Sequence, residues 1–461
     1  MVLLRFRVAN HRSFRDECEL SLASADSADG SARATGLRQG DSEVLAEPVV
    51  GIFGPNASGK SNLLSALRDM RDAVRMSFAD WTKLTEVPRQ PFKLAPEAAE
   101  ETSLYEVDLA LGVNKVRFTY GFELSDERVE AEWLYAYPRG ERVIWFDREA
   151  DRPPEDGGEF VFSEDGLNGE RDQLVGFTRP NALFLSTGAA LNDPQLSAIH
   201  RWFLDNLWLM TPGEDVAART EWTRRLLAEH RTRAQADAKR RARAETGGRS
   251  HKRPQPPSPA PPSDYPERLA QLLAIADLGL TGVDIDRETG EVALRHRTPD
   301  GGDAPLDFRS EESLGTHAWF AFLGPLLHVL DNGSALLVDE LDSSLHPTLA
   351  GEVVRLFQDP QANPRDAQLV FTTHDATLLG SEVLDRPLGR SQIWITAKRK
   401  SGESELYRLT DADPGPDENL ERGYLRGRYG GVPRVSVGEI VRELAWREQE
   451  KEREREAEAT A

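Results

Sequence analysis

The chain has 461 residues, 39% apolar content and a formal net charge of −21 at pH 7. This length predicts about two to four structural units, and the acidic surface as a whole repels nucleic acid and anionic membranes. The single cysteine, Cys18, excludes an intrachain disulfide and a cysteine-built zinc site, as expected in a reducing cytoplasm. The N-terminus lacks the apolar stretch of a signal peptide, and no run approaches the ~18 apolar residues of a membrane helix. We therefore expect a soluble, cytoplasmic protein.

The first part of the chain alternates between strand patterns and helix patterns. Residues 1–22 predict strands, and the apolar run 49–53 predicts a buried parallel strand. Apolar residues then recur at helical spacing over 60–75. Further along, residues 105–137 predict antiparallel strands, 182–186 another strand and 195–210 a helix.

A basic and then proline-rich segment follows. Arg219–Arg253 holds twelve Lys or Arg residues against four Asp or Glu residues, and prolines crowd the next stretch. We expect a charged helix over 219–245 and a disordered linker over 246–264, because dense proline favours an extended, solvated chain. This basic arm either contacts nucleic acid or is a solvated hinge. It lacks the interleaved aromatic residues that would stack on bases.

Regular patterns resume near residue 265. Strands are predicted at 335–340, 368–373, 392–396 and 405–409, with helices between the first of them. The last residues, 434–461, begin with helical spacing and become almost wholly charged, which predicts a charged helical tail.

The segment from Gly54 to Ser61 fits the P-loop pattern of glycine, four residues, then glycine-lysine-serine. A strand precedes it and an amphipathic helix follows, as the pattern requires. Its glycines allow successive N–H groups to face an anion, and the helix N-terminus adds partial positive charge. The residues expected to bind the nucleotide are Gly54, Pro55, Asn56, Ala57, Ser58, Gly59, Lys60, Ser61 and Asn62.

Two later strands supply the chemistry that a P-loop needs. The apolar run 335–338 ends at Asp339 and Glu340, so we expect Asp339 and Ser61 to hold Mg²⁺ and Glu340 to polarise the attacking water. The run 368–373 ends at His374, whose imidazole would contact the γ-phosphate or the water. With Lys60, these are the expected catalytic residues. The alternatives are an ordinary helix N-cap region for the two acids and a structural role for the histidine.

A second anion-recognising helix start is predicted at Ser313, Leu314, Gly315 and Thr316. By itself this segment also fits simple N-capping by Ser313. The chain already has one phosphate site, so this second helix start makes sense if it closes over the nucleotide of another subunit. The order of P-loop, serine-glycine helix start, aspartate-glutamate strand and histidine strand is more specific than any one member.

That order resembles the ABC-type ATPase head of SMC and RecF proteins. Within this group the chain is similar to the RloA-like ATPases of prokaryotic abortive-infection and defence operons, in "VANHRSFRDECELSL", "PFKL", "FLSTGAALN", "ADLGL", "DELDSSLHP" and "YLRGRYGGVP". The resemblance implies an α/β P-loop NTPase fold with a mixed sheet, flanking helices, an antiparallel β lobe and a helical insertion. It also implies ATP and Mg²⁺ as cofactors and a sandwich of two heads. Ser313 and Gly315 would be the trans signature residues, Asp342 the D-loop residue and His374 the switch histidine.

The chain departs from that pattern in its magnesium-sensing loop. Related sequences carry glutamine at the position of Ala190, so by resemblance either Asn192 or Gln195 would take its place. No long heptad run exists, which excludes an extended coiled-coil arm. We expect residues 1–194 to form the first half of the head, 195–300 the helical insertion and 301–433 the second half.

These features predict an ATP-dependent switch that closes two heads and opens them on hydrolysis. By resemblance it would control a separately encoded nuclease or toxin, with the insertion and the basic arm as the contact surface. One alternative is a RecF-like repair protein that binds duplex DNA through the arm, for instance through Arg240, Arg241 and Arg243. Another is a scaffold that does not hydrolyse ATP, against which Lys60, Asp339 and Glu340 argue.

Overall fold

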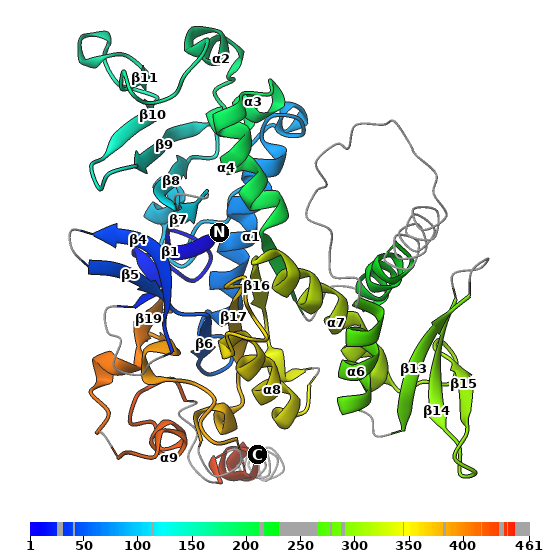
Figure 1. The fold of residues 1–461 in the computed structure, drawn as a ribbon. Coiled ribbons are helices and arrows are strands. Elements are labelled where there is room, and N and C mark those ends of the chain that lie inside the picture. The colour runs from blue at the N-terminus through cyan, green and yellow to red at the C-terminus, as the bar shows by residue number, and fades with distance from the viewer. Residues whose placement is uncertain are drawn as a thin grey trace, which may run out of the picture.

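The computed structural model describes residues 1–24, 31–39, 42–112, 115–211, 216–229, 265–276, 279–286, 291–343, 345–380, 384–415, 417–432, 438–439 and 441–447. Two sheets pack against the long helix α1 (Lys60–Met76), and side chains of both sheets and of α1 form one buried cluster (Figure 1). The helix predicted over 60–75 is therefore confirmed, and its apolar stripe faces the core. Nowhere in the described residues is a helix both long and apolar enough to cross a membrane.

The central sheet has six strands and carries the parallel part of the fold. In spatial order these are β12 (Leu207–Met210), β16 (Ala335–Val338), β17 (Gln368–Thr373), β6 (Val49–Phe53), β18 (Ile393–Lys398) and β19 (Ser404–Arg408). The first five are parallel, and β19 is antiparallel to β18. Strands β6, β16 and β17 are buried at every residue, which explains why they read as unbroken apolar runs. The strands predicted at 49–53, 335–340, 368–373, 392–396 and 405–409 are confirmed.

The second large sheet is antiparallel and has seven strands. Their order is β11 (Phe160–Val161), β10 (Val143–Glu149), β9 (Val129–Tyr137), β8 (Val116–Leu124), β7 (Ser103–Leu111), β1 (Val2–Ala9) and β2 (Cys18–Ser21). A small sheet of β3 (Ala23–Ser24), β5 (Ser42–Ala46) and β4 (Arg33–Gln39) accompanies it. The predicted antiparallel β lobe is thus present, with the N-terminal strands as part of it.

The remaining helices cover these sheets or lead into the insertion. They are α2 (Arg171–Phe177), α3 (Phe184–Ala190), α4 (Pro194–Asp205), α6 (Tyr265–Ala276), α7 (Leu314–Asn332), α8 (Pro347–Gln358) and α9 (Leu420–Leu425). Short 3₁₀ helices cover Trp81–Lys83, Pro96–Ala99, Pro154–Asp156, Leu341–Ser343, Ala376–Leu379, Arg390–Gln392 and Leu409–Ala412.

The predicted strand at 182–186 is wrong, because this run forms the start of helix α3. All of Phe184–Gly188 is buried, so the run shows no alternation that would separate a strand from a buried helix. The predicted helix over 195–210 is α4 for most of its length. It ends at Asp205, and residues 207–210 form β12 of the central sheet.

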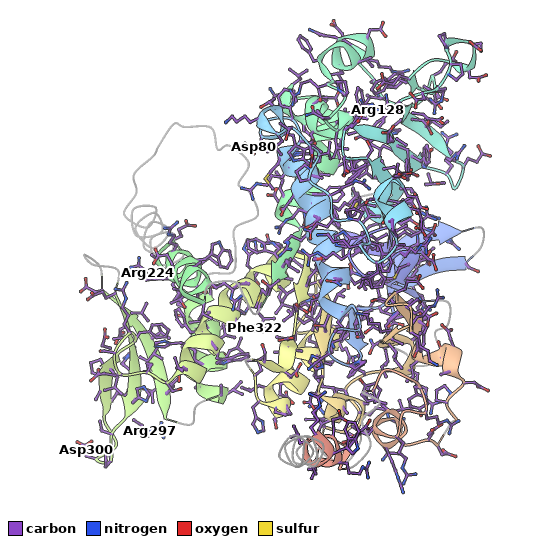
Figure 2. The ribbon with its side chains drawn as sticks, turned by 180° about the vertical axis from the view of Figure 1, so that it is seen from behind. Asp80, Arg128, Arg224, Arg297, Asp300 and Phe322 are labelled. Carbon is purple, nitrogen blue, oxygen red and sulfur yellow. The ribbon has the colours of Figure 1, made fainter. Side chains whose placement is uncertain are left out.

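The insertion contains a sheet as well as helices. A helix over residues 216–229 and α6 lie beside a three-stranded sheet of β13 (Leu280–Ile285), β14 (Val292–Arg297) and β15 (Asp303–Asp307). Seen from behind in Figure 2, Arg224 and Asp300 of this unit lie on one side of the molecule, away from Arg128 of the antiparallel sheet. Strand β12 joins the central sheet, and β15 joins the small one. We therefore propose limits of 216 and 307 for the insertion, in place of the predicted 195 and 300.

Candidate ATP-binding site

Three buried parallel strands bring the predicted site residues to one edge of the central sheet. Strand β6 leads into the P-loop, β16 ends just before Asp339, and β17 ends just before His374. These strands are immediate neighbours in the order β16, β17, β6, so their carboxyl ends meet. Ser61 and Asp339 are 278 residues apart in sequence and are hydrogen-bonded.

The P-loop backbone requires glycine at both Gly54 and Gly59. Gly54 has a φ of 159°, and a Cβ there would lie 2.2 Å from Thr396 Oγ1. Gly59 has a φ of 111°, and a Cβ there would lie 2.4 Å from Ser404 Oγ. Ala57 also has a positive φ of 62°. Neither glycine can therefore be replaced without displacing its neighbours or straining the backbone.

Lys60 is folded back over the loop that precedes it. Its Nζ donates hydrogen bonds to the carbonyl oxygens of Gly54 at 2.7 Å and Pro55 at 3.0 Å, and lies 3.3 Å from His374 Nδ1. Burial lowers the pKa of Lys60 to about 8, although the nearby acids Asp339, Glu340 and Asp342 favour the charged form. A bound phosphate would replace the two carbonyl contacts with a stronger, charge-assisted one.

The two acids at the end of β16 are held by a threonine of the next strand. Thr372 Oγ1 donates to Asp339 Oδ1 at 2.6 Å and accepts from the Glu340 backbone N–H at 2.8 Å. Ser61 Oγ donates to the same Asp339 oxygen at 3.0 Å. Glu340 has a φ of 54°, which a non-glycine residue adopts at a cost of about 1–3 kcal/mol. Asp339 is buried, whereas Glu340 lines the cavity above the P-loop.

His374 lies next to Glu340 and the loop that follows it. The two side chains approach to 3.8 Å between His374 Nε2 and Glu340 Oε1. The His374 backbone N–H donates to the carboxylate of Asp342, at 3.3 and 3.4 Å from its two oxygens. Lys60, Glu340, Asp342 and His374 thus form a connected set at the mouth of the P-loop.

A cavity of about 230 Å³ opens over these groups. It is lined by Asn56, Ala57, Ser58, Gly59, Lys60, Ser61, Asn62, Glu340 and His374. The structure therefore brings together the predicted P-loop residues, the predicted base and the predicted switch histidine in one polar space.

Ser313 and Gly315 do not line this cavity. They lie in a separate one of about 240 Å³, with Thr316 and Trp319 of the same helix and His346 at the start of α8. Ser313 is the N-cap of α7, because its Oγ accepts from the Thr316 N–H at 3.1 Å. The start of α7 is therefore capped by Ser313 and also exposed to solvent. Leu314 is 86% exposed, and its neighbours Ser313 and Gly315 are exposed too.

The segment predicted to sense magnesium lies away from the P-loop. Ala190 and Asn192 line a cavity with Arg75, at the C-terminal end of α1, whereas the P-loop precedes its first residue. Gln195 Oε1 accepts from the backbone of Asn168. Neither Asn192 nor Gln195 can therefore replace the glutamine in this structure, because α1 is about 25 Å long.

Strand β12, unlike the segment of Asn192 and Gln195, ends beside Asp339. It is the immediate neighbour of β16, and its last carbonyl, that of Met210, accepts from the Asp339 N–H at 2.8 Å. In the sequence, the residues of this strand continue the helical pattern that was predicted over 195–210. A short run of bulky apolar residues, "LWLM", was the available signal.

Four hydroxyl groups also support the site and were missed by sequence reasoning. They belong to Ser13, Thr372, Thr396 and Ser404. Ser58 Oγ and Thr396 Oγ1 lie 2.5 Å apart, so β18 contacts the P-loop directly. The signal for Thr372 was a polar side chain near the end of a strand whose centre is apolar. The others gave none, because Ser13, Thr396 and Ser404 meet partners that are 49 to 391 residues away in sequence.

Only the first part of the basic arm lies in the described residues. There Glu221 binds Arg224 at 2.7 Å and Arg225 at 3.0 Å, so these two arginines have acidic partners. Arg240, Arg241 and Arg243, like the whole predicted linker over 246–264, lie outside the described residues.

A family model described as "AAA domain, putative AbiEii toxin, Type IV TA system" matches residues 49–380, which include every site residue named above from the P-loop to His374. The chain belongs to this family. It is an ATPase with a P-loop NTPase fold, as the sequence predicts. No curated protein matches the sequence.

The solved structures that the chain is similar to include SMC heads. The SMC head domain from Thermotoga maritima is 13% identical, with a TM-score of 0.37, over 88% of this chain and 99% of its own. An SMC head bound to the C-terminal winged-helix domain of ScpA is 11% identical, with a TM-score of 0.43, over 92% of this chain and 100% of its own.

Proposed function

We propose that this ATPase is a molecular switch in which two copies close head to head around ATP and open on hydrolysis. The observation that carries this proposal is the separation of two cavities. The P-loop, Glu340 and His374 line one, and Ser313 and Gly315 line another on an exposed helix start. A second copy would bring its Ser313 and Gly315 to the nucleotide that the first copy holds.

The nucleotide would be held by the P-loop backbone and by Lys60. The backbone N–H groups of residues Asn56 to Asn62 would face the phosphates, and the Lys60 ammonium would move from the loop carbonyls to the terminal phosphates. Gly59 is the N-cap of α1, so the helix N-terminus stands directly behind that position.

Ser61 and Asp339 fit a Mg²⁺ ion. Their side-chain oxygens lie 3.0 Å apart, and hard oxygen ligands combined with phosphate and water are what this ion prefers. When bound, the ion would neutralise charge that develops on the phosphates. Thr372 Oγ1 donates to Asp339 Oδ1 and holds this carboxylate beside Ser61.

Glu340 would act as general base on the attacking water. Glu340 lines the cavity, and its Oε1 lies 3.8 Å from His374 Nε2. His374 would orient the same water or contact the terminal phosphate. Asp342 would couple this histidine to the loop that follows Glu340, since its carboxylate binds the His374 backbone.

The output would pass to a separate effector, a nuclease or toxin, in defence against phage by abortive infection. The family description, which names a toxin and a toxin–antitoxin system, supports this role. The insertion 216–307 and the basic arm are the surface we assign to the effector. The signature helix α7 supports this choice, because its first turn lies beside the insertion and its last turn leads to β16 (Figure 1).

The test is hydrolysis and binding measured together on the full chain. Glu340→Gln should lower ATP hydrolysis by about 10²–10⁴-fold and leave ATP affinity within a few-fold, because only the base is lost. Lys60→Ala should instead abolish ATP binding. Hydrolysis that persists at the wild-type rate in Glu340→Gln would show that another residue is the base.

A further inference from the structure

The turn formed by residues 10–14 packs against the first turns of α1 and has no part in the chemistry above. His11 and Phe14 pair across it, and Asn10 and Arg12 have positive φ angles of 47° and 50°. Asn10 is held by its own side chain, which donates to the Ala98 carbonyl at 2.7 Å and accepts from the Phe92 N–H at 2.9 Å. The turn is therefore a fixed part of the antiparallel lobe despite its strained backbone.

Ser13 projects from this turn onto two other segments of the chain. Its Oγ accepts from Asn62 Nδ2 at 2.7 Å and from Ser404 Oγ at 2.7 Å. Its carbonyl accepts from the Ser404 backbone N–H, also at 2.7 Å. One residue thus joins the N-terminal lobe, the first turn of α1 and strand β19.

This junction rests directly on the second glycine of the P-loop. A Cβ on Gly59 would lie 2.4 Å from Ser404 Oγ and 3.1 Å from Ser13 Oγ, so both hydroxyls pack against the backbone there. The conformation of Gly59, with its φ of 111°, is what turns the following N–H groups toward a phosphate. The Ser13 junction and the phosphate cradle therefore share one backbone segment.

A second contact fixes the same helix one turn later. His11 is fully buried, and its ring nitrogens lie 3.0 Å from Tyr105 Oη and 3.1 Å from Ser65 Oγ. Burial lowers the pKa of His11 to about 3, so the ring is neutral at physiological pH and this contact is constant. Asn62 and Ser65 are i, i+3 neighbours, so the turn contacts one face of α1 at two positions along the helix axis.

We propose that Ser13 is a positioning residue that holds the P-loop in its phosphate-binding conformation and so sets the affinity for nucleotide, not the rate of the chemical step. This inference rests on the phosphate-binding role proposed for the P-loop. It predicts that any ligand held only by phosphates, such as inorganic pyrophosphate, is as sensitive to Ser13 as ATP is.

The experiment compares Ser13→Ala with Ser163→Ala, a matched control. Ser163 is another half-buried serine of the antiparallel lobe, and its hydroxyl accepts from the Ile144 N–H at 3.2 Å, away from the P-loop. Calorimetric titration of the full chain should show about ten-fold weaker binding of both pyrophosphate and ATP to Ser13→Ala, with kcat within two-fold. Ser163→Ala should bind both as the wild type does.

Two further variants keep the proposal testable if Ser13→Ala folds poorly. Ser404→Ala removes the other hydroxyl and should weaken pyrophosphate binding by a similar factor. The double variant should be no worse than either single one, because the two groups act as a unit. Ser13→Thr, which keeps the hydroxyl, should restore binding.

The inference is overturned if pyrophosphate affinity is unchanged in both single variants, if their effects simply add, or if kcat falls while affinity stays constant. Its failure differs from failure of the P-loop assignment. In the latter case pyrophosphate would still bind to Lys60→Ala, whereas failure at Ser13 would leave the loss of binding in Lys60→Ala intact.

Discussion

A buried glutamate shows how one side chain sets the pH response of this fold. Glu132 of β9 accepts from the N–H groups of Phe184 at 2.6 Å and Leu185 at 3.0 Å, and from Tyr120 Oη at 3.1 Å. It caps the first turn of α3 from inside the protein. Burial raises the pKa of Glu132 to about 7, although Arg148 and the two backbone donors favour the charged form.

We predict that this carboxyl makes the protein less stable as the pH rises from about 4.5 to about 7. The folded state holds the proton over that range and the unfolded state does not, so unfolding becomes easier with increasing pH. Glu132→Gln should remove this component, which is on the order of 1–3 kcal/mol. Chemical denaturation of both proteins at pH 5, 6, 7 and 8 measures it. Equal pH slopes for the two would refute the assignment.

The residues around the P-loop cavity could be predicted from the sequence, because each of them follows a strong local pattern. A strand, a P-loop and an amphipathic helix are adjacent in sequence, and Asp339, Glu340 and His374 each end an apolar run. The hydroxyl groups of Ser13, Thr396 and Ser404 were not predictable. Serine and threonine are common in loops and strands, and only the assembled fold shows which of them meet the P-loop.

At the level of elements, the sequence could not assign short runs that are buried on all sides. Residues 182–186 and 207–210 are both short, mainly apolar runs. The first runs into α3, which begins at Phe184, and the second is β12. The spacing of apolar residues does not separate helix from strand in such runs, so their secondary structure depends on tertiary neighbours. Glu132 accepts hydrogen bonds from the first turn of α3, and β16 pairs with β12.

The contact between α7 and the helix over 216–229 depends on one glycine. A Cβ on Gly324 would lie 2.1 Å from Thr223 Oγ1 and 3.1 Å from its Cα, so the helices could not stay at this distance. Next to Thr223, the Trp222 ring lies 5.1 Å from that of Trp208, between centroids. Because residue 324 is glycine, the insertion packs closely on α7.

We predict that Gly324→Ala destabilises the insertion by about 1–3 kcal/mol and leaves ATP affinity within two-fold, because the P-loop is not in contact with it. Tryptophan fluorescence, to which Trp208 and Trp222 contribute among the nine tryptophans of the chain, should show a lower melting temperature. Gly176→Ala in α2 is the matched control: its Cβ meets nothing within 4 Å, and the variant should be neutral or slightly more stable. A Gly324→Ala protein as stable as this control would contradict the close packing.

For the whole molecule, the head-to-head proposal predicts a nucleotide-dependent dimer. Glu340→Gln should accumulate as a dimer with ATP and return to a monomer without it, as measured by light scattering after size-exclusion chromatography. Adding Leu314→Arg should prevent the dimer and leave ATP binding unchanged, because the 86%-exposed Leu314 lies between Ser313 and Gly315. Phe177→Arg, at a 54%-exposed position on α2, is the control and should still dimerise. If the protein with Leu314→Arg still forms the dimer with ATP, the interface does not include the start of α7.

The strand order of the central sheet also has a consequence for the synthesis of this protein. Strand β6 is made early, yet both of its neighbours, β17 and β18, are made only after the insertion, beginning at Gln368 and Ile393. Until then its five apolar residues have no partner along either edge, and pairings this distant in sequence form slowly. A ribosome-bound fragment that already displays a complete P-loop would therefore be an aggregation-prone intermediate. We expect the growing chain to need protection until about residue 400 has emerged.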